Sequence, residues 1–200
     1  MAKIKLTKNE LKKQKDALKM FRRYLPTLQL KKQQLQAEIR SVEQRVRELR
    51  EKKAALHESF KVWLGVFGEK GVFLPKILKI TKLLTSRGNI AGVEIPVFEG
   101  VEFETERYSF FEKPLWLDAA VDRMKTVLAV DLEAKTMEEQ QERLEKELRT
   151  TSQRVNLFEK VKIPESRENI RKIQVYLGDQ QTAAVVRGKI SKEKKERTAQ

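Results

Sequence analysis

Apolar residues recur at alternating spacings of three and four along both halves of the chain, and this heptad pattern constrains the fold more than any other feature. In the first half, fourteen of the seventeen seam positions are apolar, with Lys, Arg, Glu and Gln common between them. So narrow a stripe is typical of a helix that packs against one other helix. The first-half seam comprises Leu11, Gln14, Leu18, Phe21, Leu25, Leu28, Lys32, Leu35, Ile39, Val42, Val46, Leu49, Lys53, Leu56, Phe60, Trp63 and Phe67.

A second, more polar seam follows in the other half of the chain. It comprises Val127, Val130, Ala134, Met137, Gln141, Leu144, Leu148, Thr151, Val155 and Phe158, and it continues through Ile170, Ile173, Leu177 and Ala184. One chain with two such segments most simply folds back on itself. We therefore predict a mainly α fold, a long antiparallel two-helix coiled coil formed by the N- and C-terminal helices. Residues 11–67 alone would rise by roughly 85 Å along a helix.

The residues between the two seams predict a small β-hairpin inserted in the middle. Residues 76–85 are basic and rich in β-branched side chains, whereas residues 93–104 alternate apolar with acidic side chains, so the two stretches can pair by charge and by packing. Residues 86–89 supply the turn chemistry, and Pro96 places its strand at a sheet edge. The expected domains are an N-terminal coiled-coil helix (1–67), a β-hairpin and loop region (68–115) and a C-terminal coiled-coil helix (116–200).

Two prolines interrupt the seams. Pro26 lies inside the first, and Pro164 lies between apolar heptads of the second. Proline inside a helix removes one hydrogen bond and presses on the preceding turn, at a cost of about 3 kcal/mol. We expect a kink near Pro26, and a kink or a break near Pro164 where a new helix could also begin.

The net charge of +14 is concentrated near both termini. Residues 1–32 carry eleven Lys or Arg against two acids, and residues 187–197 carry six against two. In an antiparallel hairpin the two termini share one end, which would then be a basic tip. Such a tip indicates an acidic partner, although a merely solvated helix end is the alternative interpretation.

The residue types needed for catalysis do not gather anywhere in the sequence. Cysteine is absent and histidine occurs once, at His57, so no thiolate site or paired-histidine metal site is available. The many carboxylates lie among Lys and Arg at helix-surface spacing, which is typical of ion pairs. We predict no catalytic, cofactor-binding or metal-binding residue. We also expect no membrane span, because no apolar run is long enough, and no secretory signal.

Four short stretches resemble, in order and spacing, the D subunit of the V-type and A-type rotary ATPases. Residues 153–164 (QRVNLFEKVKIP) are similar to that family's arginine-valine-asparagine and isoleucine-proline signature. Residues 89–97 (NIAGVEIPV) are similar to its asparagine-isoleucine-alanine-glycine-valine and proline-valine element. Residues 30–35 (LKKQQL) and 6–11 (LTKNEL) resemble its leucine-lysine and threonine-lysine segments. The resemblance thus covers essentially the whole chain.

The resemblance implies a central-stalk rotor shaft that transmits torque between a catalytic ring and a membrane ion-translocating rotor, during ATP hydrolysis or synthesis. The implied partners are the catalytic and regulatory ring subunits, a small central-stalk subunit and a subunit that connects to the membrane rotor. The implied location is cytoplasmic, peripheral to the membrane, and the shaft itself is implied to bind no nucleotide and to catalyse nothing.

The resemblance also implies roles for particular residues. The basic tip would contact the catalytic ring through Lys3, Lys5, Lys8, Lys12, Lys13, Arg187, Lys189 and Lys192. The hairpin would serve coupling through Arg87, Asn89, Ile90, Gly92 and Val93.

Two other functions fit the residues less well. A basic helical hairpin can act as a nucleic-acid-binding arm, but the interleaved stacking aromatics that usually accompany this function are missing. A membrane-surface scaffold is a further alternative, because the basic first helix could lie on anionic lipid. Under the rotor interpretation neither nucleic acid nor a direct membrane span is expected.

Overall fold

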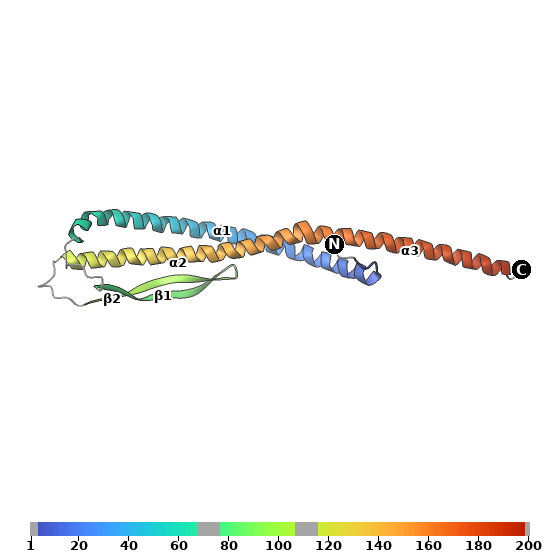
Figure 1. Ribbon diagram of the computed structural model, residues 1–200, viewed down its shortest axis with the longest axis horizontal. Coiled ribbons are helices and arrows are strands. Elements are labelled where there is room, and N and C mark those ends of the chain that lie inside the picture. Colours follow the sequence, from blue (N-terminus) through green and yellow to red (C-terminus); the bar gives the residue numbers. More distant parts are fainter. Residues whose placement is uncertain (1–3, 68–76, 107–115, 199–200) are drawn as a thin grey trace. The chain divides into compact units, whose positions relative to one another are not determined.

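The computed structural model describes residues 4–67, 77–106 and 116–198. In these ranges three α-helices, one π-helical turn and two strands follow one another (Figure 1). They are α1 (Lys8–Phe67), β1 (Leu78–Ile90), β2 (Val93–Thr105), α2 (Trp116–Asn156), a π-helical turn η1 (Leu157–Lys162) and α3 (Ile163–Thr198). The predicted fold class, two long antiparallel helical segments with a hairpin between them, is confirmed.

The chain divides into two compact units. The terminal unit comprises Met1–Lys32 and Thr150–Gln200, and the hairpin unit comprises Gln33–Arg149. Each unit contains one stretch of α1 and an antiparallel stretch from the second half of the chain.

The core of the hairpin unit is built from the predicted seams. Leu35 and Leu144 are fully buried, and Ile39, Val42 and Val46 pack into the same cluster. A second cluster joins Leu49 of α1 to Val130 and Ala134 of α2. Burying a side chain such as Leu contributes about 1.5–3 kcal/mol. The heptad positions therefore hold the two helices together.

The two strands form an antiparallel hairpin whose register pairs opposite charges. Lys79 lies opposite Glu104, and Lys82 lies opposite Glu102, as the basic and acidic stretches predict. Two irregularities shift the register, one between Ile80 and Lys82 and one between Leu84 and Thr85. Bulges of this kind strengthen the local twist of a strand.

The predicted position of the turn is wrong. Residues 86–89 continue strand β1, and the chain reverses at Ala91 and Gly92, whose φ angles are 52° and 80°. Two positive φ angles in a row match the right-handed twist of a hairpin, and the N–H of Gly92 donates to Asn89 Oδ1 at 2.9 Å. Gly88 serves packing instead, because a Cβ at this position would lie 2.8 Å from Val97 Cγ2.

In the terminal unit, α1 begins at a capped end and packs against the second half of the chain. Thr7 Oγ1 accepts a hydrogen bond from the N–H of Glu10 at 3.3 Å, which satisfies one of the free amides of the first turn. The ring of Phe21 lies 5.1 Å from that of Phe158. Ile173 is fully buried. The predicted seam thus continues in this unit.

The turn η1 lies directly before Pro164. The N–H of Ile163 donates to the carbonyl of Phe158, five residues earlier, as in a π-helix. A regular helix would press the proline ring against the carbonyl of Lys160. The wider turn provides room for the ring, and the helix continues from α2 through η1 into α3 without a break. Helix α1 likewise continues through Pro26, and the two kinks stay predictions.

Candidate functional site

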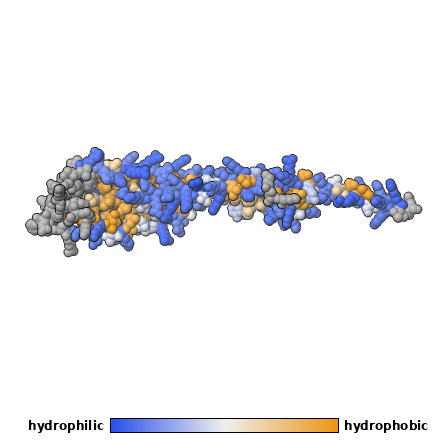
Figure 2. Space-filling view, in the orientation of Figure 1, coloured by the Kyte–Doolittle hydropathy of each residue, from blue (hydrophilic) through white to orange (hydrophobic). Residues whose placement is uncertain are grey.

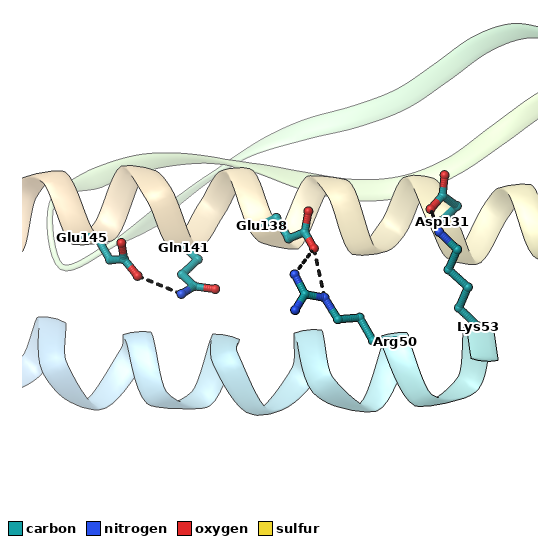
Figure 3. A network of polar contacts seen from close by, with 6 residues as sticks. All are labelled: Arg50, Lys53, Asp131, Glu138, Gln141 and Glu145. Atoms are coloured by element: carbon teal, nitrogen blue, oxygen red, sulfur yellow. Dashed lines mark hydrogen bonds and ion pairs between the residues drawn. The ribbon is translucent and has the colours of Figure 1, made fainter. Parts of the chain in front are cut away.

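Ion pairs cross from α1 to α2 beside the seam of the hairpin unit (Figure 3). Arg50 Nη2 lies 2.6 Å from Glu138 Oε1, and Arg50 Nε donates to the same oxygen at 3.2 Å. Lys53, a polar seam position, donates to Asp131. Gln141 is also a polar seam position, but its Nε2 donates to Glu145 Oε1 of its own helix at 2.8 Å and not to the facing helix. Two ion pairs therefore join α1 to α2 in addition to the buried seam.

Asp131 is held by two cations. Lys53 reaches it from α1, and Lys135 Nζ lies 3.0 Å from its second oxygen on α2. The hydrogen bond from Lys53 is the main reason that the pKa of Asp131 lies below its ordinary value of 3.8, with a further contribution from Lys135. Its side chain is only 22% exposed, so solvent screens these contacts incompletely.

Asp131→Asn should lower the free energy of unfolding by about 1 kcal/mol at neutral pH, because Lys53 and Lys135 lose their carboxylate. The pKa of Asp131 is lower in the folded chain than in the unfolded chain. The stabilisation by its ion pairs is therefore present above pH 3.8 and is lost as the pH falls through the folded-state pKa. Urea unfolding of both chains should therefore show a difference at pH 7 that shrinks at pH 3. An equal difference at the two pH values would contradict this assignment.

The hairpin is fastened along α2 by side chains that hydrogen-bond to the backbone of β2. Gln140 Nε2 donates to the carbonyl of Pro96 at 2.5 Å, and Arg143 Nη1 donates to the carbonyl of Glu94 at 3.3 Å. Gln140 is buried, and Ile95 is buried in the cluster of Leu35 and Leu144. The hairpin therefore lies alongside the helices of its unit as a third layer, as Figure 1 also shows. The sequence did not indicate that Gln140 and Arg143 hold the hairpin against α2.

The structure gives different environments to the five hairpin residues that were predicted to serve coupling. Gly92 lies in the turn and donates to Asn89 near the end of β1. Ile90 and Val93 pack against the cluster of Leu35 and Leu144. Arg87 is exposed on β1. Asn89 is exposed as well, but its Oδ1 already accepts a hydrogen bond from Gly92, so Arg87 is the exposed charged side chain among these five.

Apolar side chains are also exposed on the strands. Ile80 is 46% exposed and Leu83 is 40% exposed. Figure 2 shows a hydrophobic surface over the hairpin, whereas hydrophilic side chains cover most of the visible face. Exposed apolar surface of this kind is common where proteins meet partners.

Positive charge is concentrated in the terminal unit. This unit holds 23 Lys or Arg against 8 Asp or Glu, a net charge of +15, whereas the hairpin unit holds 20 against 21, a net charge of −1. Seven residues of the predicted basic tip have exposed side chains, namely Lys5, Lys8, Lys12, Lys13, Arg187, Lys189 and Lys192. Lys3 lies outside the described residues. Leu6 lines a pocket with Arg171 and Val175 of α3, and Arg187 lies roughly 24 Å farther along that helix. The two predicted basic segments therefore lie in one unit but not at one shared tip, and their contact with a catalytic ring stays a prediction.

The side chains of the last part of α3 are mostly exposed. From Gly178 to Lys195 every side chain except Ala183 is exposed. The exposed side chains include Val185 (60%) and Val186 (49%) together with the basic residues of the tail. This segment therefore presents both apolar and cationic groups.

Over residues 4–67, 77–106 and 116–198, no group of three His, Asp or Glu side chains is placed to hold a metal ion. None of the helices in these ranges combines the length and apolar character needed to cross a membrane. His57 is exposed on α1.

Known proteins resemble the chain over nearly its whole length. The sequence model of the family of ATP synthase D subunits matches residues 10–193. The D subunit of the V-type ATP synthase from Borreliella burgdorferi is 51% identical over 194 residues, which cover 96% of this chain and 95% of the relative. The protein of the same name from Chlamydia trachomatis serovar L2 is 36% identical over 198 residues, covering 96% and 95%. That from Chlamydia felis is 36% identical over 198 residues, covering 96% and 93%.

These matches do not favour a nucleic-acid-binding arm or a membrane-surface scaffold. They agree with the resemblance carried by the four motif stretches. The chain therefore belongs to the family of ATP synthase D subunits.

Proposed function

We propose that the chain is the rotor shaft of the central stalk and transmits torque between the catalytic ring and the membrane ion-translocating rotor. The observation that carries this proposal is the pairing of two long helical segments along a buried seam in both units. A single helix twists and bends easily, whereas two helices joined by close packing must deform together.

The polar contacts support the same role. The pairs Arg50–Glu138 and Lys53–Asp131 oppose sliding between the helices, and the docked hairpin adds a third layer to its unit. Torque applied to one helix is therefore passed to the other elements of the hairpin unit rather than absorbed by slippage.

The charge distribution supports an assignment of partners. The terminal unit, at +15, would enter the ring of catalytic and regulatory subunits, where long-range attraction allows a surface to slide past its neighbours. The hairpin unit, at −1, would meet the small central-stalk subunit and the subunit that connects to the membrane rotor. In this proposal the chain lies at the membrane periphery on the cytoplasmic side.

In this proposal three acidic side chains of α2 form ion pairs within and between the helices and do not serve catalysis. Glu138, Asp131 and Glu139 each pair with a cation on their own or the facing helix. We accordingly propose a non-catalytic subunit that binds no nucleotide itself.

Reconstitution tests the assignment. The chain, mixed with purified ring subunits, should saturate at one copy per ring at moderate salt, and the assembled complex should hydrolyse ATP. A generic polyanion such as heparin should bind only at low salt. Binding to heparin that persists at moderate salt, with no saturable association with the ring, would contradict the proposal.

A further inference from the structure

A polar cavity of about 510 Å³ opens where the hairpin meets α2. Its lining includes Thr85, Ser86 and Arg87 of β1, Glu94 and Pro96 of β2, and Arg143 of α2. All of these residues belong to the hairpin unit, and the hydrogen bonds of Gln140 and Arg143 to β2 hold its walls together.

Three side chains of β1 in this cavity form no hydrogen bond to another described protein group. Within the described part of the chain, the guanidinium of Arg87 and the hydroxyls of Thr85 and Ser86 have no hydrogen-bond or ion-pair partner. Arginine presents a rigid fork of donors that matches a carboxylate in a bidentate arrangement. Arg87 therefore lines the cavity with a guanidinium whose N–H groups are available to bind a carboxylate.

Arg143 is held by two contacts and is already paired with a carboxylate. Its Nη2 lies 2.6 Å from Glu139 Oε1, and its Nη1 donates to the carbonyl of Glu94. Among the lining residues, Glu94 carries the single negative charge against the two arginines. The lining is therefore net positive, in a unit whose net charge is −1.

We propose that this cavity receives an acidic side chain of the small central-stalk subunit, whose carboxylate binds Arg87 with help from the hydroxyls of Thr85 and Ser86. The inference rests on the proposed function for the identity of the partner. The exposed Ile80 and Leu83 on the same strand provide apolar surface for the body of that partner. Arg87 thus supplies specificity beside a hydrophobic contact.

Titration calorimetry with the purified small subunit and the full chain tests this contact. Arg87→Gln should raise Kd about tenfold, because charge-assisted bonds are lost, and Arg87→Lys should recover part of the affinity. The matched control is Lys79→Gln, which removes an exposed cation from the same strand and should change Kd by less than about twofold. Circular dichroism melting of all variants should coincide with that of the wild-type chain.

A double-mutant cycle tests the carboxylate itself. Each exposed Asp or Glu of the small subunit is changed to the amide and titrated against the wild-type chain and Arg87→Gln. Changing one of these acidic residues to its amide should raise Kd about tenfold with the wild-type chain and should hardly change Kd with Arg87→Gln. An Arg87→Gln chain that binds like Lys79→Gln, or the absence of any coupled acidic residue, would overturn the inference. Failure of the wild-type chain to bind the small subunit would instead contradict the proposed place in the central stalk.

Discussion

Leu144→Asp should lower the free energy of unfolding of the hairpin unit by about 4 kcal/mol or more. Leu144 is fully buried, in one cluster with Leu35 of α1 and Ile95 of the hairpin. Truncating a buried Leu costs about 2–5 kcal/mol, and a carboxylate among apolar side chains adds a desolvation penalty. All three layers of this unit meet at this position, so the damage should extend to both the helix pair and the hairpin.

Thermal unfolding followed by circular dichroism measures this effect. The matched control is Glu142→Asp, which introduces the same residue two positions away on an exposed part of α2. The control should lose only the small difference in helix propensity, a few tenths of a kcal/mol. Equal melting temperatures for Leu144→Asp and Glu142→Asp would rule out a buried seam at Leu144.

Removal of residues 187–200 should weaken binding to the catalytic ring by about tenfold or more at low salt. The deletion removes six Lys or Arg and two Glu from an exposed part of α3 while sparing the buried Ile173 and the whole hairpin unit. The remaining affinity should depend less on salt, because charge near a binding surface mainly sets association rate and salt dependence. Binding of the small stalk subunit should stay within about twofold of the wild-type value.

A second variant separates charge from chain length. Replacing the six Lys and Arg of residues 187–197 with Gln keeps the helix but removes its cations, and it should reproduce most of the loss at low salt. If the deletion instead abolishes binding of the small subunit and spares the ring, the assignment of partners to the two units is reversed.

The helical part of the fold could be predicted because heptad spacing states directly which side chains a helix must bury. Leu35, Val42 and Leu49 occupy predicted seam positions and are buried. The cross-strand charges were also readable, since Lys82 and Glu102 belong to stretches of opposite sign. The heptad spacing repeats many times along the chain, and the charges of the two strands lie close together in sequence.

The turn and the docking of the hairpin could not be read in the same way. Residues 86–89 have turn-forming composition, yet Gly88 is required because Val97 packs over it from the opposite strand. Gln140 is polar and lies next to the seam residue Gln141, so its burial depends on a β2 carbonyl 44 residues away in sequence. The one available signal was the apolar face of Val93, Ile95 and Val97, which needed a surface to cover it.

Direct observation of rotation tests the central claim. Because the chain contains no cysteine, Lys79→Cys on the exposed face of β1 supplies a unique thiol on this chain for attaching a bead. With the catalytic ring fixed to a surface, the bead should rotate in one direction when ATP is added and stop when ATP is removed. A complex that hydrolyses ATP at its normal rate while the bead shows no directed rotation would contradict the rotor assignment.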